Sequence, residues 1–226
     1  MLTQTAKRAA LSWEHRIGYL SSLFVTAGGV LYFLVLLGAM AAGRFTFPPE
    51  EGLQLFGGIA SLLYCPAIVL MMVSLHQVTP APKKVLSQAA LGFALLFAIA
   101  VSINRFSQLG VVRQAALAGR VDGLSWFLAY GDYSIMLGLE YLGWAWFLGL
   151  SMLCAAPLFS GGRLENWIRV LMLLYGALGL ISAVGFLAGS WLSLLGFAAW
   201  GVVLVVITGM MAGYFRKGGS GSPVVR

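Results

Sequence analysis

The sequence predicts an all-α protein: a polytopic membrane helical bundle with six transmembrane helices and a short interfacial amphipathic helix on its outer surface. Three observations predict this class. Hydrophobic residues make up 60% of the 226 positions, charged residues make up only 9%, and the uncharged runs between the charges are long. An ordinary soluble domain is about one quarter charged. Intrinsic disorder is excluded too, because disordered chains combine low hydrophobicity with high charge.

The uncharged runs have the length of transmembrane helices, each of which needs about 20 apolar residues. The stretch between Arg169 and Arg216 is too long for one helix and divides at Gly189–Ser190, a turn signal. The runs are continuous, without the alternation of a membrane β-barrel. We expect six spans, at residues 17–42, 53–75, 85–108, 133–159, 167–188 and 191–215.

These spans predict a single transmembrane domain over residues 1–217. The remaining residues, 218–226, begin with a Gly/Ser-rich stretch, which is the composition of a flexible tail.

The longest connection, residues 109–132, predicts the amphipathic helix. Leu117, Val121, Leu124 and Leu128 recur at helical spacing. A helix with one apolar face lies flat on a membrane surface. Two interpretations stay open: a tether between the third and fourth spans, or a lid over a pocket that opens outward.

The charge distribution predicts the orientation. Six spans place both termini on one side, and the positive-inside rule identifies that side as cytoplasmic. In this orientation the cytoplasmic segments hold ten of the 14 Lys and Arg residues. The basic residues are spread over short segments beside lipid headgroups, whereas a nucleic-acid site needs them clustered on one folded face. We therefore expect the lipid bilayer as a partner and no nucleic acid.

Glu140 lies well inside the fourth span, roughly 10 Å below its outer end at 1.5 Å per residue. A carboxylate at this depth is expensive and should face the bundle interior, be paired or be protonated. Asn104 and Arg105 lie near the outer end of the third span, and Gln108 is one helical turn from Asn104. Trp144, one turn from Glu140, adds an aromatic wall.

Three interpretations of this polar cluster remain open. It can be a structural ion pair that fixes the third span to the fourth, the polar floor of a ligand or ion site, or a protonation switch. An aromatic wall beside an acid is typical of a pocket for a cationic or amphipathic ligand, but bulky core residues also look like this.

His15 and His76, the only histidines, are both predicted at the cytoplasmic boundary, so they are weak candidates for a metal or haem site. The chain lacks the spacing of three or four ligands that a metal centre needs. It also lacks the short motifs of metalloproteases, P-loop proteins and serine hydrolases. We therefore expect no metal, no cofactor and no catalytic residues, although an enzyme is not excluded.

Three short segments carry a family resemblance: residues 102–113 (SINRFSQLGVVR), 139–143 (LEYLG) and 156–165 (APLFSGGRLE). They resemble segments of bacterial six-span integral membrane proteins that are known only as uncharacterised families. The resemblance covers a small part of the chain. It implies a bacterial cytoplasmic (inner) membrane and no particular activity.

Three functions are compatible with these observations. The first is a non-enzymatic protein that binds or passes a small amphipathic or hydrophobic ligand in an outward-facing pocket within the membrane. The second is an accessory or assembly subunit of a larger membrane complex, with other membrane subunits as partners. The third is a lipid-modifying enzyme that uses Glu140 as an acid or base.

Overall fold

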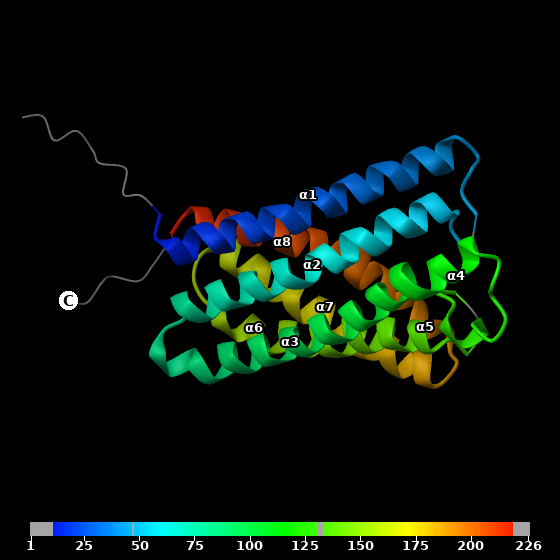
Figure 1. The fold of residues 1–226 in the computed structure, drawn as a ribbon. Coiled ribbons are helices and arrows are strands. Elements are labelled where there is room, and N and C mark those ends of the chain that lie inside the picture. Colours follow the sequence, from blue (N-terminus) through cyan, green and yellow to red (C-terminus); the bar gives the residue numbers. More distant parts are fainter. Residues whose placement is uncertain (1–10, 47, 131–132, 219–226) are drawn as a thin grey trace, which may run out of the picture.

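Six long apolar helices form one bundle in a computed structural model of the chain, which describes residues 11–46, 48–130 and 133–218 (Figure 1). All six are long and apolar enough to cross a membrane, which confirms the predicted fold class. The six helices are Trp13–Ala41, Glu51–Val78, Ala81–Leu117, Ile135–Leu158, Arg163–Leu187 and Trp191–Arg216.

The described chain begins and finishes at the same end of the bundle (Figure 1). We call this the termini end and the opposite one, which carries residues 118–130 and 133–134, the loop end. Residues 219–226 of the predicted tail lie outside the described residues, as does Asp132 beside the predicted start of the fourth span.

Three of the six spans are continuous or nearly continuous α-helix, and three contain a π-helical turn. The first, second and fifth spans are α1 (Trp13–Ala41), α2 (Glu51–Val78) and α7 (Arg163–Leu187). The third consists of η1 (Ala81–Lys83), α3 (Lys84–Ser107), the π-helical η2 (Gln108–Val112) and α4 (Arg113–Leu117). The fourth consists of α5 (Ile135–Glu140), the π-helical η4 (Tyr141–Phe147), α6 (Leu148–Ala155) and η5 (Ala156–Leu158). The sixth consists of η6 (Trp191–Leu194), the π-helical η7 (Phe197–Val203) and α8 (Leu204–Arg216).

The spans are arranged as a ring in chain order. Each span packs against the next one along the chain, and α8 packs against α1 and closes the ring. Small residues permit a close approach between the fourth and fifth spans. A Cβ atom on Gly179 would lie 2.6 Å from the main-chain oxygen of Ala145, so only glycine fits there.

The hydrophobic core extends from the termini end to the middle of the ring. The largest side chains that are fully buried lie there: Ile68, Met71, Met72, Leu75, Phe97, Leu148, Met152, Phe159, Ile168, Met172, Tyr175 and Phe215. Interhelical hydrogen bonds reinforce it, for example from Ser151 Oγ to the carbonyl oxygen of Ala90 at 2.7 Å.

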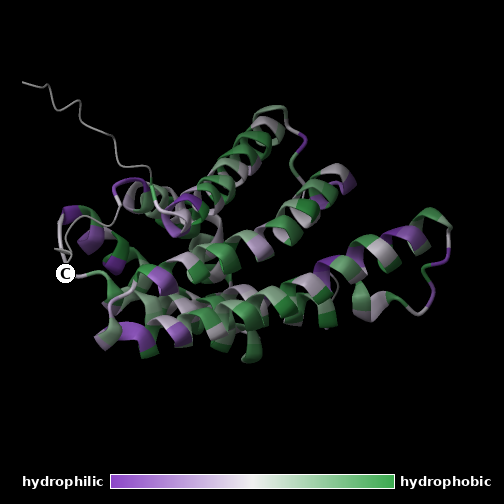
Figure 2. Cartoon of the chain, turned by 60° about the vertical axis from the view of Figure 1, so that its left-hand side comes forward, coloured by the Kyte–Doolittle hydropathy of each residue, from purple (hydrophilic) through white to green (hydrophobic). Residues whose placement is uncertain are grey.

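At the loop end the ring is less tightly packed. Helix α1 buries Gly18, Ser21, Ser22, Val25 and Gly29, and none of its residues beyond Gly29 is buried. In Figure 1 this part of α1 runs beside α2 and diverges from the sixth span. Along the helices the outer surface is largely hydrophobic, and hydrophilic residues gather towards the helix ends (Figure 2). This pattern is that of a protein surrounded by lipid.

The segment predicted as a surface helix takes a different form. The third span continues to Leu117, nine residues beyond its predicted end at residue 108. The chain then turns at Gly119 and Gly123, which adopt φ values of +67° and +78° that favour glycine. One 3₁₀ turn, η3 (Ser125–Phe127), follows in the described part of this segment. The apolar residues do recur at helical spacing in the sequence, but the two glycines interrupt the helix that this spacing predicted.

Candidate functional site

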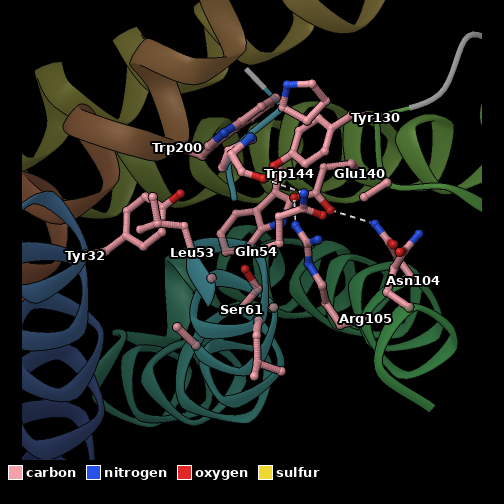
Figure 3. A pocket seen from close by; sticks show the side chains of 18 of the residues that line it. Tyr32, Leu53, Gln54, Ser61, Asn104, Arg105, Tyr130, Glu140, Trp144 and Trp200 are labelled. Carbon is pink, nitrogen blue, oxygen red and sulfur yellow. Dashed lines mark hydrogen bonds and ion pairs between the residues drawn. The ribbon is translucent and has the colours of Figure 1, made fainter. Parts of the chain in front are cut away.

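A pocket of about 800 Å³ lies in the loop-end half of the bundle (Figure 3). Its walls come from α1, α2, the third, fourth and sixth spans and the residues that follow α1 and precede α5, whereas α7 contributes nothing. Small-molecule pockets in proteins typically measure about 300–1,000 Å³. The cavity is therefore large enough for a small amphipathic molecule.

A polar cluster of three side chains lines this pocket. Asn104 Nδ2 donates a hydrogen bond to Glu140 Oε2 at 2.7 Å, and Arg105 forms an ion pair with Glu140 Oε1. The side chains of Arg105 and Glu140 are each 16% exposed. A carboxylate inside a membrane requires such partners, because its desolvation is otherwise uncompensated.

Local structure fixes the positions of these groups. Ser134 caps α5, where its Oγ accepts hydrogen bonds from the main-chain N–H groups of Met136 and Leu137 at 3.1 and 3.2 Å. The helix that begins there directs Glu140 towards α3 (Figure 3). Asn104 Nδ2 also donates to the carbonyl oxygen of Met136 at 3.1 Å, which joins α3 to the first turn of α5.

The three π-helical segments all contribute to the pocket. η2 provides Leu109, η4 provides Trp144, and η7 provides Trp200. A π turn accommodates an extra residue in the helix and is frequent at functional sites. In η4 the main-chain oxygen of Trp144 accepts a hydrogen bond from the fully buried Tyr175 hydroxyl at 2.8 Å. The packed core therefore supports this wall of the pocket.

The two other residues predicted for the site also line the pocket, but neither is bonded to Glu140. Gln108 Nε2 donates to the carbonyl oxygen of Phe127 at 2.6 Å, so Gln108 attaches the loop to the third span. Trp144 is 5% exposed and packs edge-to-face on Phe97, with ring centroids 4.7 Å apart.

Sequence reasoning missed several pocket residues from more distant spans. Tyr32, Tyr64 and Trp200 contribute aromatic walls. Near the beginning of α2, Glu51 Oε1 lies 3.3 Å from Arg113 Nε and forms a second, more exposed ion pair. The sequence alone does not show whether an aromatic residue within a span faces a pocket or the lipid. The Glu51–Arg113 pair became possible only because the third helix extends further than predicted.

The two histidines have separate partners. His15 Nδ1 lies 2.8 Å from Ser12 Oγ, and His76 Nδ1 lies 2.8 Å from Ser87 Oγ. Within the described residues, no group of three or more His, Cys, Asp or Glu side chains is placed to hold a metal ion.

No protein-family model, no curated protein and no solved structure matches this chain. The fold and the pocket therefore carry the functional argument. They define a multi-pass helical membrane protein with an aromatic-walled cavity beside a largely buried ion pair.

Proposed function

We propose that this chain is a non-enzymatic membrane protein that binds or passes a small amphipathic or hydrophobic molecule in the loop-end pocket. One observation carries the proposal: the cavity of about 800 Å³ reaches the Glu140–Arg105 pair. An ion pair that serves only to join two helices is typically enclosed by packed side chains. Here the pair borders a cavity with largely apolar walls, which is how ligand sites combine apolar surface with a few polar groups.

We further propose a bacterial cytoplasmic membrane, with both termini in the cytoplasm and the pocket open to the outside. The excess of Lys and Arg in the segments at the termini end supports this orientation. Cysteine labelling tests it in a background with Cys65 and Cys154 replaced by alanine. In intact cells, a membrane-impermeant maleimide is expected to label Thr46→Cys at the loop end and to spare Ser160→Cys at the termini end. The reverse pattern contradicts the orientation.

A pocket-filling substitution tests ligand binding. Ser61 lines the cavity and is not one of the residues of the polar cluster, so Ser61→Phe places a ring in the open space. Leu63 lies on the same helix, is 49% exposed and does not line the pocket, so Leu63→Phe is the matched control.

Native mass spectrometry measures binding of four amphiphilic probes: monolauroylglycerol, dodecanoate and dodecyltrimethylammonium, which share a 12-carbon chain, and decylubiquinone, which has a 10-carbon chain. We expect at least one to bind the wild type and Leu63→Phe, and to bind Ser61→Phe at least tenfold more weakly. The proposal fails if the two variants bind every probe equally.

The other two functions gain no specific support. The exposed apolar surface is what a lipid-facing bundle requires, so it does not indicate a partner subunit. Both carboxylate oxygens of Glu140 already accept hydrogen bonds from protein groups, which does not favour an acid or base that acts on a lipid.

A further inference from the structure

The pocket contains an excess of buried hydrogen-bond donors. Five buried polar atoms of its lining residues have no hydrogen-bond partner within the described protein. One of them, Arg113 Nε, lies 3.3 Å from Glu51 Oε1 in the second ion pair. The other four are Tyr64 Oη, Asn104 Oδ1, Arg105 Nε and Trp144 Nε1. Asn104 Oδ1 is an acceptor, and the other three groups can donate. Leaving a buried polar atom without a partner costs about 1–3 kcal/mol. All four atoms lack a partner, and they belong to residues that line the same cavity.

The donors come from three different spans. Tyr64 belongs to α2, Arg105 to α3 and Trp144 to η4, and all three line the pocket. Figure 3 shows Arg105 and Trp144. The Trp144 indole is 95% buried, as its exposed fraction is 5%. Each of the three donor atoms has almost no exposed surface, so an acceptor oxygen of a ligand reaches it once its side chain turns towards the cavity.

The charges that line the pocket are balanced. Its described lining contains two basic and two acidic residues, and each basic residue is paired with an acidic one: Arg105 with Glu140 and Arg113 with Glu51. An anionic or cationic head would add an uncompensated charge to a mostly apolar cavity, at a large desolvation cost. A neutral head avoids this cost.

We infer that the pocket selects a neutral amphiphile whose head carries carbonyl oxygens, held by the donors of Trp144, Tyr64 and Arg105. This inference rests on the proposed function and deepens it. Two sources offer this chemistry: a planar quinone ring, which can also stack on the aromatic walls, and the ester head of an uncharged acylglycerol.

A probe series separates head charge from chain length. Native mass spectrometry is expected to show binding of monolauroylglycerol or decylubiquinone, each at least tenfold tighter to Leu63→Phe than to Ser61→Phe. Dodecanoate and dodecyltrimethylammonium, with chains of similar length and a charged head, are expected to bind at least tenfold more weakly than the better neutral probe. Preference for decylubiquinone identifies a quinone-type head, and preference for monolauroylglycerol identifies an ester head.

Two conservative variants test the donors. Trp144→Phe and Tyr64→Phe each remove one N–H or O–H group and keep an aromatic ring. Each is expected to weaken binding of the preferred neutral probe about threefold to tenfold, the usual effect of one hydrogen bond. Thermal stability of the ligand-free Tyr64→Phe protein should not fall, because the hydroxyl has no protein partner to lose.

The outcomes distinguish the inference from the proposed function. If a charged probe binds best and is blocked by Ser61→Phe, the pocket binds ligands but the inferred head chemistry is wrong. The inference also fails if neutral probes bind but neither Trp144→Phe nor Tyr64→Phe weakens them. If Ser61→Phe affects no probe, the proposed function and the inference fail together.

Discussion

The two halves of this bundle use similar residue types for different purposes. Towards the termini end, fully buried methionine, leucine and aromatic side chains pack inside the ring, and Tyr175 directs its hydroxyl to a main-chain oxygen. In the loop-end half, aromatic residues surround a cavity of about 800 Å³, and two polar residues of its lining, Asn104 and Glu140, are hydrogen-bonded to each other. The same six helices therefore form a packed half towards the termini end and a hollow half at the loop end.

The comparison shows where a helical membrane protein can keep a cavity. Small residues of the first span, such as Gly18 and Gly29, let α1 approach the bundle, and beyond Gly29 none of its residues is fully buried. The three π-helical segments all lie in the hollow half. The packed half holds the helices in place, and the departures from regular packing and regular helix geometry coincide with the pocket.

The largest expected difference between the halves comes from truncating one leucine in each. Leu148→Ala removes a fully buried side chain from the packed half and should destabilise the protein by about 2–5 kcal/mol. Leu137→Ala removes a half-buried side chain that already borders the cavity, so it should cost about 1 kcal/mol or less. Reversible unfolding in mixed micelles measures both. Equal losses would show that the loop-end half is packed as tightly as the other.

Breaking the ion pair inside the hollow should have the next largest effect. Glu140→Gln leaves the guanidinium of Arg105, which is only 16% exposed, without its carboxylate and should cost about 2–3 kcal/mol. Glu51→Gln breaks a pair whose carboxylate is 68% exposed and should cost less than about 0.5 kcal/mol. The same unfolding assay compares them. A cost for Glu140→Gln as small as that for Glu51→Gln contradicts the burial of the first pair.

The hydrogen bond that joins the two halves should have a moderate effect. Tyr175→Phe leaves the buried main-chain oxygen of Trp144 without its 2.8 Å partner and should destabilise the protein by about 1–2 kcal/mol. Tyr133→Phe, at a side chain that is 88% exposed, serves as the control and should change little. If ligand affinity is unchanged in Tyr175→Phe, the core does not support the η4 wall as we describe.

Filling the hollow should have the smallest effect on stability. Ser61→Phe adds a ring to open space, so the free energy of unfolding should change by no more than about 0.5 kcal/mol. Thermal unfolding and size-exclusion chromatography check this. A large loss of stability would show that the space beside Ser61 is occupied by protein.

The arrangement of the spans could be predicted because charges are costly in lipid and therefore mark the helix ends. The predicted spans differ from the observed helices by a few residues, except at the third, which runs on to Leu117. Helical spacing alone cannot show whether a helix continues from a span or begins anew beyond it. In the structure the helix continues from the span, and the chain turns at Gly119 and Gly123, which have positive φ values.

The proximity of Asn104 and Arg105 to Glu140 followed from depth in the membrane, since a buried carboxylate needs partners at its own level. The aromatic walls other than Trp144 did not follow, because the rotation of α1, α2 and the sixth span about their axes has no clear signature in the sequence. Tyr64 and Trp200 could equally have faced lipid. The π-helical turns were unpredictable for a related reason: an extra residue in a turn leaves no mark in an apolar run.

Photo-crosslinking tests most directly that the hollow half is a ligand site. The probe is a monolauroylglycerol analogue with a diazirine in its acyl chain, and mass spectrometry maps the labelled residues. We expect labels on pocket residues such as Tyr32, Leu53 and Trp200, and we expect Ser61→Phe to remove them while Leu63→Phe does not. Labels confined to lipid-facing residues such as Leu34 and Val184, unchanged by Ser61→Phe, would contradict a ligand site in this pocket.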